Sequence, residues 1–105
     1  MAGPIFETAV LSEILKSLYH RGEQPQLFFW RTSTGAEVDI IVDHGGRLVP
    51  VEVKASSTPR PAMSDGIRSF QECFGAKAAR GYVVHAGDVW LPLGKKVTAV
   101  PFGAL

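Results

Sequence analysis

Residues 37–54 read EVDIIVDHGGRLVPVEVK, and this stretch decides the fold. Apolar and polar residues alternate on both sides of Gly45-Gly46, which is the period of a β-strand with one buried face. Two glycines between such segments are typical of a two-residue hairpin turn, whose loop residues often need a positive φ. The sequence therefore predicts two antiparallel strands, from Glu37 to Asp43 and from Arg47 to Lys54.

Counting outward from this turn gives the register of the two strands. Asp39 is then expected directly opposite Glu52. Glu37 is expected opposite Lys54, and the period of two places all four side chains on one face of the hairpin. The other face is predicted to be apolar and to consist of Val38, Ile40, Val42, Val49, Val51 and Val53.

The opposed carboxylates of Asp39 and Glu52 indicate a cation site. Directly opposed Cβ atoms are about 4.5–5.5 Å apart, and like charges at that distance destabilise a sheet. Mg²⁺ prefers carboxylate and water oxygens, and Lys54 beside the ion can steer a phosphate oxygen or help to orient an attacking water. This set suits phosphodiester hydrolysis. The alternative is a solvated outer face with cross-strand ion pairs such as Glu37 with Lys54.

The sequence around the hairpin predicts helices and further strands. Residues 4–21 carry apolar side chains at helical spacing, and residues 64–74 repeat the pattern before Gly75. Besides the hairpin, the segments predicted as strands are residues 27–30, 81–85, 89–91 and 97–100. The order of helix, three strands, helix and strands indicates an α/β or α+β domain.

Glutamates of the first helix are candidates for a third carboxylate. On a helical projection Glu7 falls inside the apolar arc, whereas Glu13 lies at its edge. A charge within that arc requires a partner. If this helix covers the charged face of the hairpin, Glu7 can reach the same cation as Asp39 and Glu52. The alternative is a first-turn acid that is favoured by the helix dipole.

The composition describes one globular domain without a strong charge. Of the 105 residues 46% are hydrophobic and 20% are charged, and the net charge is +1, so no overall basic field indicates nucleic acid or membrane. No apolar run approaches the roughly 20 residues that span a bilayer. Cys73, the single cysteine, excludes an intrachain disulfide and is expected to be a buried thiol. We therefore expect a cytoplasmic protein with no membrane partner.

Several segments together carry a family resemblance. Asp39, a spacer of twelve residues and then Glu52-Val53-Lys54, preceded by a helix with a glutamate, resemble the PD-(D/E)XK nuclease superfamily. More closely, GPIFETAVLSEILK, FFWRT, GAEVDIIV and VEVKASS resemble the C-terminal domain of unknown function of a family of prokaryotic AAA-type ATPases. This resemblance covers roughly residues 3 to 75.

The resemblance implies a restriction-endonuclease-like mixed central sheet flanked by helices. It also implies that Glu7, Asp39 and Glu52 bind Mg²⁺ or Mn²⁺ and that Lys54 is the catalytic lysine. Glu13 is the second candidate for the helix carboxylate. Residues 1–105 are expected to form a single nuclease-like domain, the C-terminal piece of a longer ATPase, because the chain has no GxxxxGK[ST] nucleotide-binding motif.

Two functions remain open at this point. The first is a metal-dependent endo- or exodeoxyribonuclease that hydrolyses DNA, and the complete set of Asp, Glu and Lys favours it. The second is a catalytically silent nuclease-fold module that binds DNA or protein and regulates an attached AAA-type ATPase, and the near-neutral charge favours it. DNA is the expected partner, although RNA stays open, and related nucleases that pair to cut two strands leave room for a homodimer.

Overall fold

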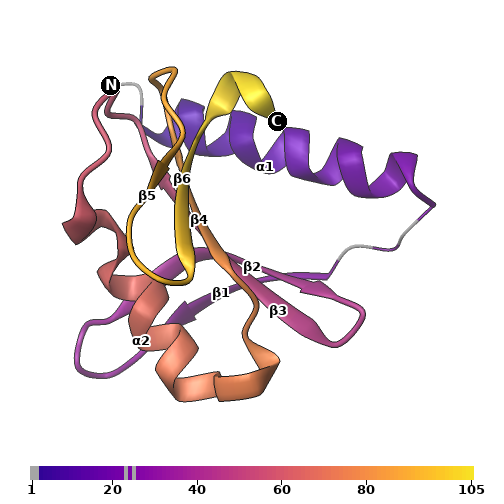
Figure 1. The fold of residues 1–105 in the computed structure, drawn as a ribbon. Coiled ribbons are helices and arrows are strands. Elements are labelled where there is room, and N and C mark those ends of the chain that lie inside the picture. Colours follow the sequence, from indigo (N-terminus) through magenta and orange to yellow (C-terminus); the bar gives the residue numbers. More distant parts are fainter. Residues whose placement is uncertain (1–2, 23, 25) are drawn as a thin grey trace.

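A mixed six-stranded sheet forms the centre of the molecule, with one helix packed on each face (Figure 1). The computed structural model describes residues 3–22, 24 and 26–105. In Figure 1, α1 runs along the top of the view and α2 lies at the lower left. The expected fold class, a mixed sheet flanked by helices, is confirmed.

The strands follow the order β1-β2-β3-β4-β6-β5 across the sheet. Strands β3, β4 and β6 are parallel to one another, and the remaining neighbours are antiparallel. The helices are α1 Gly3–His20 and α2 Asp65–Phe74, and the strands are β1 Gln26–Arg31, β2 Glu37–His44, β3 Arg47–Lys54, β4 Gly81–His85, β5 Leu91–Pro92 and β6 Val97–Pro101. Short 3₁₀ turns occupy Pro61–Ser64, Gly75–Lys77 and Phe102–Ala104.

Most of these elements lie where the sequence predicts them, and β5 is the exception. The strand predicted at residues 89–91 is displaced, because β5 covers Leu91–Pro92 and only Leu91 belongs to both. The ring of the fully buried His85 explains the shift. Its Nε2 donates a hydrogen bond to the Val89 carbonyl at 2.8 Å, and its Nδ1 accepts one from the Gly87 amide at 3.0 Å. These bonds hold Val89 in a loop.

Both faces of the sheet are buried, so neighbouring residues of one strand point into different cores. On the α2 face Ile41 and Val83 pack with Ile67 and Phe70 of the helix. On the α1 face the buried core consists of Val10, Leu18, Ile40, Val42, Val51, Val84 and Val100. Strands covered on both faces are apolar on both faces, which explains the continuous run of residues 40–42. The predicted hairpin with one dry and one charged face is therefore wrong for most of its length.

An extra residue in β2 breaks the alternation at Asp39. Strand β1 pairs Phe28 with Ile41 but Trp30 with Val38, so three steps along β2 match two steps along β1. This is the geometry of a β-bulge. Val38 consequently packs on the α2 face, whereas Ile40 packs on the α1 face. The prediction that Val38 and Ile40 share a face is wrong for this reason.

One prediction from composition is wrong. Cys73 is exposed, which contradicts the predicted buried thiol. It lies in the last turn of α2, where Phe70 and Phe74 point toward the core in its place. Among the described residues, no helix combines the length and the apolar character needed to cross a membrane.

Candidate functional site

The β2–β3 hairpin has the predicted register near its turn. His44 lies opposite Arg47, and the pairing continues without interruption to Ile40 opposite Val51. The paired positions end there, at the side of the hairpin away from the turn. We call this side, with Asp39 and residues 52–54, the open end. The candidate site residues Asp39, Glu52 and Lys54 all lie on it.

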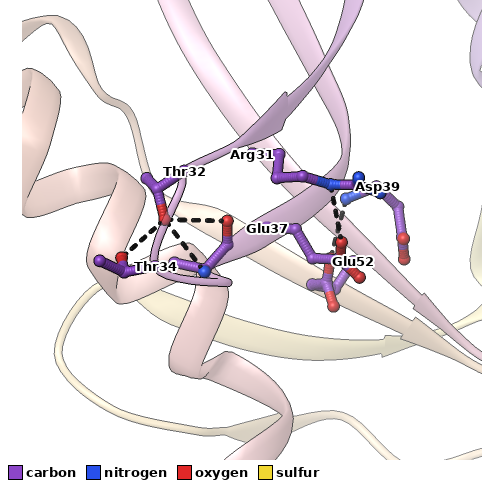
Figure 2. A network of polar contacts seen from close by, with 7 residues as sticks. Arg31, Thr32, Thr34, Glu37, Asp39 and Glu52 are labelled. Atoms are coloured by element: carbon purple, nitrogen blue, oxygen red, sulfur yellow. Dashed lines mark hydrogen bonds and ion pairs between the residues drawn. The ribbon is translucent and has the colours of Figure 1, made fainter.

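Two reciprocal hydrogen bonds replace the backbone pairing at the open end. The Asp39 amide donates to Glu52 Oε1 at 2.8 Å, and the Val53 amide donates to Asp39 Oδ2 at 2.9 Å. Each carboxylate thus binds the backbone of the opposite strand. Figure 2 shows the Glu52 carboxylate beside the Asp39 backbone amide, to which a dashed line joins it. The structure brings the two residues together at the open end.

Glu52 is a buried acid with competing neighbours. Only 7% of this residue is exposed. Burial, and secondly the charge of Asp39, raise the pKa of Glu52 to about 7. The hydrogen bond from the Asp39 amide and Lys54 Nζ, 3.5 Å from Glu52 Oε2, act in the opposite direction. The Glu52 carboxyl group therefore titrates near neutral pH. A bound cation would favour its carboxylate form.

Lys54 lies beside Glu52 on the α2 side of the sheet. Both residues line a hollow of about 270 Å³ together with Glu37 and Gly66. Glu37 forms its ion pair with Arg31, at 3.5 Å, and not the pair with Lys54 that the alternative interpretation used as its example. The bulge in β2 explains the difference, because it moves Glu37 out of the hairpin register.

Glu7 lies on the other side of the sheet. It is exposed, so water solvates its charge, and the expectation that this charge needs a partner is wrong. Glu7 and Asp39 line a second hollow, of about 190 Å³, whose wall also includes Leu11, Phe28 and Phe29. Glu52 is not part of that wall. Of the four candidate residues, Glu7 and Asp39 therefore share one hollow, and Glu52 and Lys54 share the other.

The alternative helix carboxylate, Glu13, lies away from both hollows. It forms an ion pair with Lys16 at 3.2 Å, one turn further along α1. Within residues 3–22, 24 and 26–105, no group of three or more His, Cys, Asp or Glu side chains is arranged to hold a metal ion. The metal-ligand roles of Glu7, Asp39 and Glu52 and the catalytic role of Lys54 stay predictions.

The sequence did not single out two residues beside the site, Phe29 and Gly66. Phe28 and Phe29 are exposed next to Asp39, and Gly66 of α2 packs so closely on the Glu37 carbonyl that a Cβ atom would clash with it. The run LFFW has no alternation that separates buried from exposed aromatic residues. For Gly66 a signal was present, because an isolated glycine within a predicted helix often has a packing or functional reason.

Comparison with known proteins places the chain in a family. The model of a domain of unknown function, DUF4143, matches residues 2–105. The chain belongs to the DUF4143 family. Two relatives are the uncharacterised proteins Mb2031c of Mycobacterium bovis and Rv2008c of Mycobacterium tuberculosis, each 37% identical to this DUF4143 chain over 75 residues. That match covers 71% of this chain but 16% of each relative, so the matched part is about a sixth of the mycobacterial proteins.

Proposed function

We propose that this DUF4143 domain is a nuclease-like domain of the PD-(D/E)XK type that hydrolyses DNA phosphodiesters with a divalent cation. The observation that carries the proposal is the position of Asp39 and Glu52, which contact each other's strands at the open end with Lys54 Nζ 3.5 Å from Glu52. Two carboxylates and water are a suitable donor set for Mg²⁺ or Mn²⁺.

The residues of the open end fit such a cation. Burial and Asp39 raise the pKa of Glu52, and a positive ion would offset both effects by stabilising the carboxylate. Asp39 and Glu52 would hold the ion, and Glu7 is the third candidate because it shares a hollow with Asp39. A bound cation of this kind lowers the pKa of its water and stabilises the charge that develops on phosphorus.

Lys54 and Glu52 supply the remaining chemistry. The Lys54 ammonium is partly exposed, with 41% of its side chain accessible, so it can contact a phosphate oxygen from the solvent side. Glu52 would place the cation next to this ammonium, because its Oε2 lies 3.5 Å from Lys54 Nζ. Both residues line the same hollow, which gives a phosphodiester one place to meet them.

A second candidate is favoured by a specific observation. Each carboxylate already accepts a hydrogen bond from a backbone amide of the opposite strand. Asp39 and Glu52 can therefore have a structural role, in which they stabilise the contact between β2 and β3 at the open end. The domain would then be a catalytically silent module that binds DNA or protein. The much greater length of the mycobacterial relatives supports a module that regulates an attached part, such as an AAA-type ATPase in the cytoplasm.

Titration of Mg²⁺ into the metal-free chain, followed through backbone amide resonances, separates the two candidates. The catalytic proposal expects shifts at the amides of Asp39 and Val53, because their acceptors bind the ion instead. Asp39→Asn should abolish these shifts. Glu72→Gln, an exposed acid of α2 outside the open end, should keep them. Absence of any shift at millimolar Mg²⁺ would contradict the catalytic proposal and leave the silent module.

Cleavage of branched and single-stranded DNA is the second stage. Lys54→Ala should abolish Mg²⁺-dependent cleavage while the chain remains folded, because the lysine is partly exposed. Lys16→Ala, a lysine of α1 that pairs with Glu13, is the matched control and should cleave normally. Equal cleavage by wild type and Lys54→Ala would assign the activity to a contaminant or to another site.

A further inference from the structure

The two edge strands of the sheet differ in how well they are protected from pairing with a further strand. At one edge, β5 has two residues, and Pro92 has no amide hydrogen to offer a further strand. At the other edge, β1 has six residues and no proline. Among the described residues no strand pairs with its outer side. Proteins generally shorten or block an exposed edge, because its open backbone groups pair with other chains. Strand β1 has neither protection.

Aromatic side chains lie on both faces of this open edge. Along β1, Leu27 packs in the α1-face core and Trp30 packs against the α2-face core. Since successive side chains of a strand alternate, Phe29 lies on the α1 face and Phe28 on the α2 face. These two residues are 66% and 49% exposed. A platform for nucleic-acid bases presents its aromatic residues on one face of a sheet, whereas an added strand contacts both faces.

We propose that β1 pairs with β1 of a second copy of this chain, in antiparallel orientation, so that the two sheets become continuous. The charge pattern supports a second copy as the partner. Arg31, at one end, is the one charged residue of β1. An antiparallel pair centred on Phe29 puts Arg31 opposite the partner's Leu27, about 13 Å along the strand from the partner's Arg31.

The same pairing brings aromatic residues together. Phe29 faces the partner's Phe29 on one side of the sheet, and Phe28 faces the partner's Trp30 on the other. Cross-strand aromatic pairs of this kind stabilise antiparallel strands. Parallel pairing, in contrast, would place the two Arg31 side chains near each other. The dimer does not depend on a cation, yet it places the two β2 strands, and with them the two Asp39 residues, about 15 Å apart across the junction.

Sedimentation equilibrium of the metal-free chain from micromolar to millimolar concentration tests this proposal. Wild type should show a reversible monomer–dimer equilibrium. Phe29→Lys should raise the dissociation constant at least tenfold, because it puts two ammonium groups face to face. Tyr19→Lys on α1 is the matched control, since Tyr19 has the same 66% exposure, and it should dimerise like wild type. A chain that stays monomeric at millimolar concentration would overturn the proposal.

Amide hydrogen exchange of residues 26–31 supplies a readout that a general loss of solubility would not change. Exchange should be slower at high than at low protein concentration in wild type, and independent of concentration in Phe29→Lys. Equal weakening of the dimer by Tyr19→Lys would show that association uses another surface. Shifts of the β1 amides on addition of an oligothymidylate to a monomeric chain would instead assign β1 to single-stranded nucleic acid and overturn the dimer.

Discussion

The two ends of the β2–β3 hairpin carry the same kind of residue in different settings. At the turn end, Asp43 Oδ1 accepts a bond from the Gly46 amide at 3.3 Å, three residues away and in contact with solvent. At the open end, the bonds of Asp39 and Glu52 join residues that are 13 and 14 positions apart. A local bond follows from the neighbouring sequence, whereas a long-range bond depends on how the strands and α2 pack. The four predictions below test this difference.

The largest effect is expected from an added methyl group on α2, where Gly66 packs against the start of β2. Gly66→Ala places a Cβ atom against the Glu37 carbonyl, which cannot move without shifting α2 or β2. We expect a loss of about 3 kcal/mol in the free energy of unfolding, measured with urea. At the turn end, the Cβ atom added in Gly46→Ala meets no atom within 4 Å. The free energy of unfolding should fall by about 1 kcal/mol, because an alanine is strained at the φ of 86°. Equal losses would contradict the distinction.

The next effect concerns pH and Glu52. Its pKa is raised from 4.5 to about 7, so between these values the folded chain binds more protons than the unfolded chain. The free energy of unfolding should therefore fall by roughly 2–3 kcal/mol as the pH rises from about 4.5 to 7, since one pKa unit is worth about 1.4 kcal/mol.

Glu52→Gln should remove this dependence. Asp43→Asn should keep it, because Glu52 is unchanged. The curves are measured by denaturation in the presence of a chelator, and parallel curves for wild type and Glu52→Gln would refute the assignment.

A smaller loss is expected when a carboxylate is removed from either end of the hairpin. Asp39→Ala leaves the Val53 amide without its acceptor in a partly buried place, which costs about 1–2 kcal/mol. Asp43→Ala should cost less than about 1 kcal/mol, because water replaces the exposed bond to Gly46. Faster hydrogen exchange at the Val53 amide in Asp39→Ala checks the cause. An unchanged exchange rate would mean that the amide finds another acceptor.

The smallest effect is expected for Lys54. Its ammonium lowers the pKa of Glu52, so Lys54→Met should raise that pKa above about 7. Stability should change by less than about 1 kcal/mol, because the lysine side chain is 41% exposed and its ion pair is partly screened. The pKa is followed through the carboxyl ¹³C resonance of Glu52. In the control Lys16→Met, whose lysine pairs with Glu13 instead, the Glu52 resonance should titrate as in wild type.

The hairpin shows how far the sequence alone predicts the site. Two glycines and an alternating pattern were enough for the turn and for the register from Ile40 to His44. The same register brings Asp39 close to Glu52, as predicted, but Asp39 lines one hollow and Glu52 the other. A bulge leaves no mark in a pattern of apolar residues that are buried on both faces. The exposure of Glu7 and Cys73 was missed because helical periodicity does not tell how wide a strip the sheet covers.

The sequence by itself determined the helices, the hairpin and the order of elements, because periodicity, glycine turns and strand alternation act over a few neighbouring residues. The tertiary structure alone decided which face each core residue joins, where the pairing of β2 and β3 ends, and which edge of the sheet stays open. Those features depend on contacts between residues far apart in the chain, such as Gly66 with Glu37 and Val53 with Asp39. The hairpin register predicts which strand positions lie near each other, but it does not encode the bonds of their side chains or the packing of α2.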